Sequence, residues 1–254
     1  MDLKDCVALV TGAARRLGRG IALELARAGS HVVVHYRGSR EQAERTAAEI
    51  RGLGVEAHLA QADLARPEEI DRLFSDLRGR FDRLDVLVNS AASFERSPFD
   101  EITAEAWDRV IAVNLRAPFL CTQQAARWIK AGGERTGEAG LIVNLVDLSG
   151  VNPWLGYAHH GVSKAGLLHL TKAAARELAP EVRVNAVVPG PILPPPGIDS
   201  ESPDWRRIGK RVPAGRSGDP AQIGDAVVFL ARNDFITGET IFVDGGEHLL
   251  SDHH

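Results

Sequence analysis

The chain has 254 residues, of which 44% are hydrophobic, and this is enough to fill the core of one α/β domain. Its formal net charge of −4, with arginines and acidic residues interspersed, excludes a general electrostatic attraction to nucleic acid. No apolar run reaches the length of a membrane span and no secretory signal precedes the first strand, so we expect a cytoplasmic protein without a membrane partner.

Strand-like and helix-like segments alternate along the chain. The first strand is expected over residues 6–12 and the first helix over 17–29, where apolar residues recur at helical spacing and Gly29 ends the pattern. Further strands are expected over 31–36, 55–61, 85–89, 140–146, 182–188 and 240–245. Further helices are expected over 40–52, from Pro67 onward, over 104–130 as one or two segments, over 160–179 and over 220–232.

Most of these strands are near-continuous runs of Val, Ile and Leu, which is typical of strands buried on both faces. Parallel strands that alternate with helices are joined by right-handed crossovers. The sequence therefore predicts a single α/β domain over residues 1–254, a Rossmann-type, doubly wound parallel sheet of about seven strands flanked by helices.

A proline-rich stretch, "PGPILPPPG" (189–197), follows one of the predicted strands. Its prolines cannot join a central strand, so a loop is expected there. Ligands bind such sheets outside the carboxyl ends of the strands. Both a plain surface connection and a substrate-binding lid over 191–210 remain open.

The segment "TGAARRLGRG" (11–20) lies between the first strand and the first helix. Gly12 and Gly18 suit a tight turn whose backbone N–H groups and positive helix end face a pyrophosphate. Arg15 and Arg16 add positive charge at the same place. A helix start with chance glycines is the alternative interpretation.

The second strand ends in "HYRGSR" (35–40), where dinucleotide-binding folds that use NAD usually carry an Asp or Glu for the ribose hydroxyls. This segment has no acidic residue. Arg37, Ser39 and Arg40 instead offer guanidinium groups and a hydroxyl that suit a 2′-phosphate. The pattern favours NADP(H) over NAD(H), although these residue types also occur at ordinary helix starts.

Together these motifs resemble the short-chain dehydrogenase/reductase family, with Arg16 standing where the middle glycine of the family's TGxxxGxG turn is usual. Further segments resemble family motifs in the family's order: "ADL" (62–64), "NSAA" (89–92), "NLRAPF" (114–119), "VPGPI" (188–192) and "FVDGG" (242–246). The resemblance spans nearly the whole chain. It implies a homotetramer, built through helices at 104–130 and 155–179 and the C-terminal edge. It also implies an NADP(H) site formed by Gly12, Arg15, Arg16, Leu17, Gly18, His35, Tyr36, Arg37, Ser39, Asp63, Leu64, Asn89, Ser90, Ala91, Lys164, Pro189, Gly190 and Ile192.

Within that family, the motifs look most like those of pteridine reductases and bacterial dihydromonapterin reductases. In that group an Arg replaces the middle glycine, and an Asp takes the position of the family's catalytic Ser. A Phe there sandwiches the pterin against the nicotinamide, and a Tyr lies beside it. The resemblance implies that Arg16, Phe94, Asp147 and Tyr157 contact the substrate. Arg16 and Phe94 can also be read as a phosphate contact and a loop aromatic.

The family's proton donor is the Tyr of a YxxxK motif, with the catalytic Ser thirteen residues earlier. In "YAHHGVSK" (157–164), Lys164 corresponds to the Lys, but His160 occupies the Tyr position. Asp147 lies thirteen residues before His160, and Asn114 matches the family's catalytic Asn. Asn114, Asp147 and Lys164 thus occupy the family's catalytic positions, and His160 occupies the position of the family's proton donor.

Three outcomes of this replacement remain open. The charge of Lys164 disfavours an imidazolium at His160, whereas a carboxylate at Asp147 favours it, so the two residues can form a working acid pair. Alternatively the proton comes from Asp147 or from water, and His160 positions Lys164. In the third case the site binds cofactor without turnover.

The other histidines and the cysteines give no sign of a metal site. His159 and His160 are adjacent and point apart on a helix, while His31 and His35 are too far apart on a strand to share an ion. We read His58, His159 and His169 as solvated or packed side chains. Cys6 and Cys121 belong to no CxxC pattern, which favours buried thiols of a reducing compartment over a disulfide. The tail "SDHH" is assigned no role.

The leading hypothesis is an NADPH-dependent oxidoreductase that transfers hydride to a small pteridine-like or related C=N/C=O substrate. One alternative is a generic carbonyl reductase or alcohol dehydrogenase, for instance one similar to 3-oxoacyl reductases. Another alternative, of a different class, is a non-catalytic NADP(H)-binding protein, because the catalytic Tyr is replaced by His160.

Overall fold

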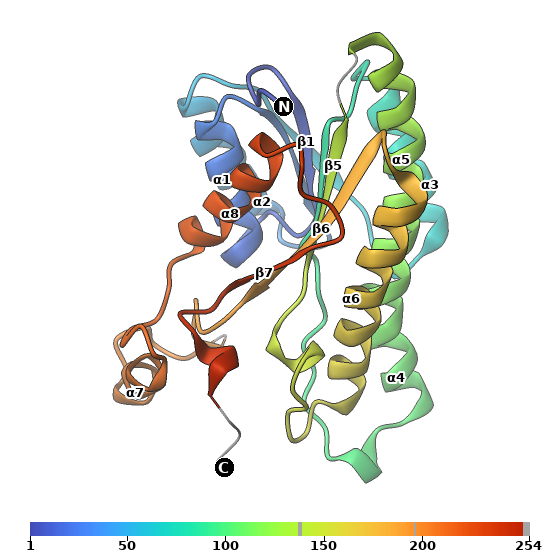
Figure 1. Ribbon diagram of the computed structural model, residues 1–254. Helices are drawn as coiled ribbons and strands as arrows, with labels where there is room; N and C mark the ends of the chain where they lie inside the picture. Colours follow the sequence, from blue (N-terminus) through green and yellow to red (C-terminus); the bar gives the residue numbers. More distant parts are fainter. Residues whose placement is uncertain (137–138, 196, 251–254) are drawn as a thin grey trace.

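The computed structural model describes residues 1–136, 139–195 and 197–250, so Pro196 and the "SDHH" tail lie outside the described residues. In those ranges one parallel sheet has seven strands in the order β3-β2-β1-β4-β5-β6-β7 (Figure 1). The strands are β1 (Val7–Val10), β2 (His31–Tyr36), β3 (Ala57–Gln61), β4 (Val86–Asn89), β5 (Gly140–Leu145), β6 (Val182–Pro189) and β7 (Thr240–Val243). The predicted Rossmann-type sheet is confirmed.

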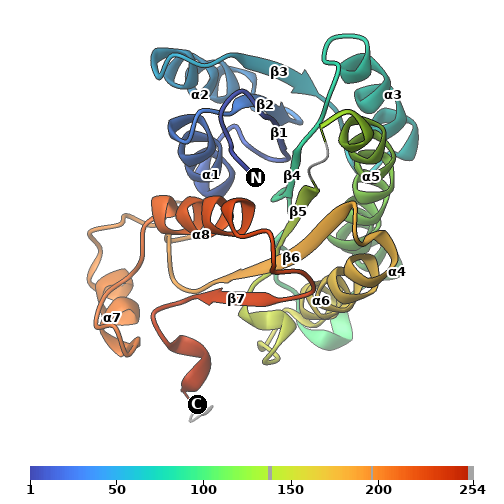
Figure 2. The ribbon, with the colours of Figure 1, turned by 45° about the horizontal axis from the view of Figure 1, so that its top comes forward.

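Helices cover both faces of the sheet, with α1, α2 and α8 on one face and α3, α5 and α6 on the other (Figures 1 and 2). Their bounds are α1 (Arg16–Arg27), α2 (Arg40–Gly52), α3 (Pro67–Arg78), α4 (Ala104–Ile111), α5 (Ala117–Thr136), α6 (Ala158–Leu178), α7 (Pro203–Arg211) and α8 (Pro220–Arg232). No helix in the described ranges is long and apolar enough to cross a membrane.

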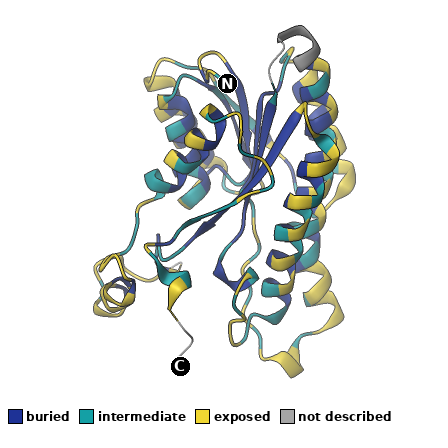
Figure 3. Ribbon diagram, in the orientation of Figure 1, coloured by how far each residue is buried: buried dark blue, intermediate teal, exposed yellow. Residues whose placement is uncertain are grey.

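The five inner strands are almost entirely buried because they carry apolar side chains toward both helical layers, whereas the edge strands β3 and β7 are mostly half-buried (Figure 3). One core cluster joins Val10 and Val34 of the sheet to Ile21 and Leu25 of α1. A second cluster joins the opposite face to α3 and α5. Burial of the inner strands on both faces is what the near-continuous apolar runs predict. Because all the strands run parallel, their carboxyl ends lie at one edge of the sheet.

Two differences from the predicted elements concern helix starts. Helix α6 begins at Ala158, earlier than the expected residue 160, because the carbonyl of Tyr157 accepts the N–H of Gly161 at 2.8 Å. The 191–210 stretch is not loop throughout, because α7 forms within it. Ser202 caps that helix by accepting the Trp205 N–H at 3.3 Å, and Pro203 occupies its first turn.

The expected helix over 104–130 is two helices joined by five residues of π-helix, Ala112–Arg116. A π-bulge widens the helical ladder locally and is frequent at functional sites. Asn114 lies in this segment and is buried. The irregularity therefore coincides with a residue that the sequence places among the catalytic candidates.

Candidate active site

The predicted glycine turn lies at the carboxyl end of β1 and leads into α1. Gly12 has a left-handed backbone, with φ of +68°, and a Cβ on Gly18 would lie 2.4 Å from the Gly12 carbonyl oxygen, so only glycine fits there. Within the described part of the chain, α1 has neither a side-chain cap at Arg15 nor an acidic residue in its first turn. The N–H groups of Arg16 and Leu17 are thereby left for a ligand, which fits a cofactor diphosphate.

Arg16 adopts a left-handed backbone, with φ of +56°, at the position where the family turn usually has glycine. This conformation costs an L-residue about 1–2 kcal/mol. Its guanidinium donates a 2.8 Å hydrogen bond to the carbonyl of Pro194 in the proline-rich loop. The loop and the start of α1 enclose a hollow of about 520 Å³, lined by Arg16, Arg19, Leu193, Pro194, Pro195, Gly197, Ile198, Asp199, Ser200 and Pro220. The loop therefore lies directly beside the glycine turn, as a lid requires.

His35, which the resemblance places among the cofactor contacts, lies beneath the turn and is only 2% exposed. Its Nδ1 accepts the Gly12 N–H at 3.1 Å, and its Nε2 lies 3.1 Å from the Ala62 carbonyl, to which it donates. These partners assign the neutral Nε2–H tautomer. Burial lowers the pKa of His35 to about 4. Its side chain supports the turn, and Tyr36 beside it is also buried.

The segment after β2 presents its charged residues to solvent. Arg37 and Arg40 are exposed and Ser39 is half-buried. Gln61 donates a 2.9 Å hydrogen bond to the Arg37 carbonyl, which fixes the turn, and Arg40 pairs with Glu44 at 2.9 Å. These donors, with no carboxylate at the end of β2, fit a 2′-phosphate.

Thr11, which the sequence reasoning overlooked, ties the glycine turn to the "NSAA" segment. Its Oγ1 accepts the N–H groups of Ser90 at 2.9 Å and Ala91 at 3.0 Å. Ala91 in turn lies 3.0 Å from where a Cβ on Gly12 would stand. The position of Thr11 directly before Gly12 is the feature of the sequence that could have indicated this role.

Two further cofactor candidates use their polar groups within the protein. Asn89 is buried and donates to Asn144 Oδ1 at 2.9 Å. Asp63 Oδ1 accepts the Ala65 N–H at 3.0 Å, and the neighbouring Leu64 is buried. The side chains of Asn89 and Asp63 therefore shape their segments, and their roles toward a cofactor stay predictions.

The late motifs meet at the carboxyl end of β6. Pro189 is the last residue of that strand, and a Cβ on Gly190 would lie 2.6 Å from the Asp244 Cα. Ile192 is buried, and Gly218 approaches its side chain closely. Glycine at 190 therefore allows the loop to leave the strand against the "FVDGG" segment.

The four catalytic candidates come together as the sequence register predicts. Asp147 follows β5, Asn114 comes from the π-helix, and His160 and Lys164 lie one turn apart at the start of α6. Lys164 is buried and donates a 2.8 Å hydrogen bond to the Leu145 carbonyl. Its other two ammonium hydrogens are of the kind that bind ribose hydroxyls.

His160 is almost fully enclosed, at 1% exposure. Its Nε2 lies 2.7 Å from Asp147 Oδ2, and its Nδ1 lies 3.1 Å from the Ser93 carbonyl and 3.2 Å from Asn114 Nδ2. Asn114 is oriented by the Ser93 N–H, which donates to its Oδ1 at 2.7 Å. Nε2 therefore donates to the Asp147 carboxylate, whereas Nδ1 lies between an acceptor, the Ser93 carbonyl, and a donor, the Asn114 amide.

The Asp147 carboxylate and the Lys164 ammonium each shift the pKa of the other. Burial alone would raise the pKa of Asp147, but hydrogen bonds from His160 and Ser149 and the charge of Lys164 lower it to about 2. Burial lowers the pKa of Lys164, and the Asp147 charge opposes that shift. Asp147 is therefore an anion across the neutral range, with 19% of its side chain exposed.

Aromatic side chains form one wall beside this cluster. Phe94 stacks on Tyr157 with ring centroids 4.7 Å apart and meets His160 edge-on at 4.8 Å. Trp154, which the sequence reasoning missed, meets Tyr157 edge-on at 6.1 Å. Phe94 keeps 52% of its surface exposed, so a ligand can contact this wall.

Other histidines lie outside the cluster. His169 is exposed, whereas His159 is fully buried, and neither of its ring nitrogens has a hydrogen-bond partner among the described residues. No group of three or more His, Cys, Asp or Glu side chains in the described ranges is arranged to hold a metal ion. Cys6 and Cys121 are both buried and form no disulfide among the described residues, and Cys6 Sγ donates to the Asp2 carbonyl at 3.0 Å.

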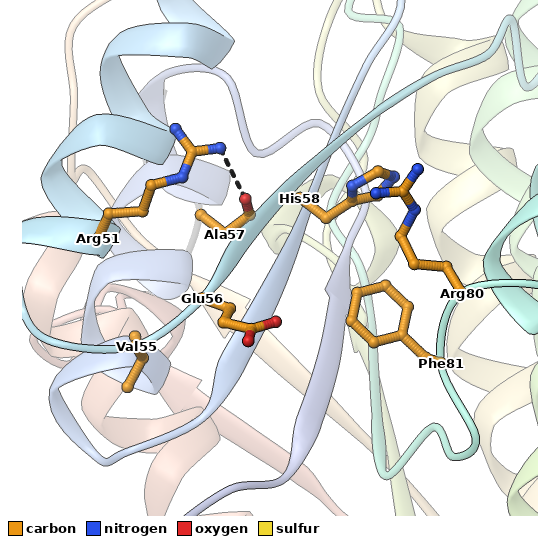
Figure 4. Close-up of a pocket in the computed structure, with 7 residues that line it drawn as sticks. All are labelled: Arg51, Val55, Glu56, Ala57, His58, Arg80 and Phe81. Carbon is orange, nitrogen blue, oxygen red and sulfur yellow. Dashed lines mark hydrogen bonds between the residues drawn. The ribbon is translucent and has the colours of Figure 1, made fainter.

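A second hollow, of about 390 Å³, lies next to the start of β3 (Figure 4). His58 packs there edge-on against Phe81, with centroids 5.9 Å apart, and Arg51 donates to the Ala57 carbonyl at 2.7 Å. Parallel sheets bind ligands outside the carboxyl ends of their strands. This hollow at the amino end of β3 is therefore separate from the candidate active site.

Comparison with known proteins places nearly the whole chain in one family. The family model described as Enoyl-(Acyl carrier protein) reductase matches residues 12–248. The 3-oxoacyl-[acyl-carrier-protein] reductase FabG of Staphylococcus aureus is 38% identical over 95% of this chain and 98% of its own length. The corresponding protein of Aquifex aeolicus is 37% identical over 97% of this chain and 98% of its own.

Solved structures resemble the chain over nearly its whole length. FolM Alternative dihydrofolate reductase 1 from Brucella canis, complexed with NADP, has a TM-score of 0.88 and 31% identity, covering 99% of this chain and 98% of that one. The angucycline C-6 ketoreductase LanV with bound NADP has a TM-score of 0.87 and 32% identity, covering 98% of each chain. The chain belongs to the short-chain dehydrogenase/reductase family of NAD(P)-dependent oxidoreductases.

Proposed function

We propose that the protein is an NADP(H)-dependent reductase of a small carbonyl substrate, whose proton is supplied by the pair His160 and Asp147. The observation that carries this proposal is the 2.7 Å contact between His160 Nε2 and Asp147 Oδ2, in register with Asn114 and Lys164. We favour a carbonyl substrate over a pteridine because several relatives, at 37–38% identity, are 3-oxoacyl reductases. LanV, a ketoreductase, supports the same choice.

The residues present fit the cofactor in three places. The uncapped start of α1 offers N–H groups to the diphosphate, Arg37 and Ser39 face a 2′-phosphate, and Lys164 has ammonium hydrogens for the ribose. When bound, NADPH supplies a hydride for the substrate carbon. Beside it, Asp147 and the aromatic wall orient the substrate.

The reduced carbonyl oxygen then needs a proton. In this proposal the His160 ring begins with hydrogens on both nitrogens. The Nε2–H bond of His160 breaks and its proton passes to the Asp147 carboxylate, which delivers a proton to the substrate oxygen. The hydrogen on Nδ1 stays in place, hydrogen-bonded to the Ser93 carbonyl, and the ring becomes neutral. Asp147 is the member that meets the substrate, because 19% of its side chain is exposed against 1% for His160.

A second candidate, reduction of a dihydropterin, is favoured by a specific arrangement. Phe94 presents an open face beside Asp147 and His160, as a planar substrate requires, and Arg16 holds a strained backbone that keeps a guanidinium at the glycine turn. FolM, whose name describes an alternative dihydrofolate reductase, is among the similar structures.

NADPH oxidation with a panel of 3-oxoacyl thioesters, simple ketones and 7,8-dihydropterins tests both candidates. We expect turnover of carbonyl compounds. Turnover of dihydropterins alone would transfer the assignment to the second candidate. Tight NADPH binding, measured by fluorescence, without turnover of any compound would contradict both and support the non-catalytic alternative.

Arg37→Ala tests the choice of cofactor. Loss of a charge-assisted contact to the 2′-phosphate is expected to weaken NADPH binding about tenfold and to leave NADH binding unchanged. Fluorescence titration with both cofactors measures this. Arg45→Ala is the matched control, since it removes an exposed Arg of the helix that follows, α2, where it pairs with Glu41. Equal weakening of both cofactors by Arg37→Ala would contradict a 2′-phosphate contact.

A further inference from the structure

Ser149 lies two residues after Asp147, in the short turn Leu148–Gly150, and is 5% exposed. Its backbone N–H donates to Asp147 Oδ1 at 3.0 Å, and its hydroxyl donates to the same oxygen at 2.5 Å. Oδ2 accepts from His160 Nε2. The two carboxylate oxygens therefore have different partners, and the two donors of Ser149 both act on the oxygen that His160 does not use.

The turn is held against α6 by two glycines. A Cβ on Gly150 would lie 2.8 Å from the backbone of Lys164, and a Cβ on Gly161 would lie 2.9 Å from the Ser149 carbonyl oxygen. Both distances are too short for any larger residue without a shift. Packing this close fixes the backbone of the turn relative to the helix that carries His160. With the backbone fixed, the orientation of the Asp147 carboxylate depends on the hydrogen bonds to its two oxygens.

We propose that Ser149 is a positioning residue whose hydroxyl locks the Asp147 carboxylate in the rotamer that presents Oδ2 to His160. The role in proton supply rests on the proposed function, whereas the effect on the Asp147–His160 contact does not. A backbone N–H at 149 alone suffices to cap the turn, so the hydroxyl is the part that adds the second donor. Alanine at this position would keep the cap and remove only that donor.

The hydroxyl also holds Asp147 in its anionic form. The charged groups that act on this carboxylate are His160 and Lys164, both from α6, and Ser149 adds a neutral donor from its own turn. Loss of that donor raises the pKa of Asp147 from its low value. It also lets the carboxylate turn away from His160. Both changes affect the proton donor and leave the cofactor contacts in place.

The test compares Ser149→Ala with Ser149→Thr, which keeps a hydroxyl, and with Ser30→Ala. Ser30 is fully buried and donates to the Leu3 carbonyl at 3.0 Å, so its loss removes a comparable bond away from the site. We expect Ser149→Ala to lower kcat about tenfold with KM for NADPH within about twofold, and to move the acid limb of the pH profile upward. Ser149→Thr should stay close to wild type, and Ser30→Ala should leave the pH profile unchanged.

A second readout needs no substrate. In cofactor-free protein labelled with ¹⁵N-histidine, the Nε2–H of His160 bonded to a carboxylate gives a low-field proton signal. We expect Ser149→Ala to weaken or shift this signal and Ser149→Thr to preserve it. An unchanged signal and an unchanged pH profile in Ser149→Ala would overturn the proposal. If no compound is turned over, the proposed function fails, and the His160 signal still decides the role of Ser149.

Discussion

Replacing His160 with Phe, or Asp147 with Asn, is expected to lower kcat for carbonyl reduction by about 10²–10⁴-fold in each case. The double variant is expected to be no slower than the slower single variant. The reason is that the two groups share one hydrogen bond of 2.7 Å and the proton passes through both, so removal of either interrupts the same step. Steady-state rates of NADPH oxidation measure the effect.

Two controls separate this chemistry from damage to the fold. NADPH affinity, measured by fluorescence, should change little in these variants, because neither side chain is expected to hold the cofactor. Leu155→Ala alters the most exposed apolar side chain of the neighbouring loop, at 92% exposure, and should react like wild type. If His160→Phe keeps the wild-type rate, His160 is not the proton source, and losses that multiply in the double variant would show two independent roles.

The same contact joins two departures from the general family pattern, which has a Ser at the position of Asp147 and a Tyr at the position of His160. The resemblance to pteridine reductases already implies an Asp at 147, and in this chain that Asp bonds His160. A hydroxyl at 147 would leave an imidazole at 160 without an anionic partner, and the charge of Lys164 would then disfavour its protonated form. Asp147 therefore supplies the anionic partner that an imidazole at 160 needs.

Sequence reasoning was most successful where the signal is local. The glycine turn, the alternation of strands and helices, and the register of Asp147, His160 and Lys164 all depend on the spacing of residues along the chain, which the sequence shows directly. It missed α7, although Ser202 and Pro203 form a typical helix start, because the prolines before them dominated the interpretation. The residues that start this helix, Ser202 and Pro203, are visible in the sequence and are enough to predict it.

Contacts between distant segments were not accessible in the same way. The Ser93 carbonyl at His160 Nδ1 joins residues 67 positions apart, and the Thr11 bond to Ala91 joins residues 80 positions apart. Which polar group faces which backbone atom is decided by the packing of several elements at once. The direction of the His35 ring is another example, because the sequence placed it at the cofactor and the structure places it under Gly12.

Acidification from pH 7 to pH 4 is expected to lower the free energy of unfolding by about 3 kcal/mol through His35 alone. Burial lowers the folded-state pKa of this ring to about 4, against an ordinary value of about 6.5. Below the ordinary value the unfolded chain binds the proton more readily than the folded one. The neutral ring therefore contributes stability that is present above about pH 6.5 and is lost as the pH falls to about 4.

The structural cause is a clash of donors. Nδ1 accepts the Gly12 N–H at 3.1 Å, and a proton on Nδ1 would set two donors against each other inside the core. Urea denaturation at several pH values between 7 and 4 measures the slope. His35→Gln is the matched variant, since an amide can accept from Gly12 and donate to Ala62 without titrating, and it should lose this part of the slope.

Comparison with His35→Gln also isolates His35 from other groups. Burial lowers the pKa of His58 and His159 as well, and their contributions stay the same in both proteins. Asp147 contributes only a little down to pH 4, because a folded-state pKa of about 2 against an ordinary value of 3.8 places most of its loss of stabilisation below pH 4. That small part is the same in both proteins. Equal slopes for wild type and His35→Gln would show that His35 is not the titrating group. Protonation of the 2′-phosphate weakens NADPH binding over this pH range in both proteins. Since the His35 ring also holds the Gly12 turn in place, NADPH affinity should weaken more in wild type than in His35→Gln.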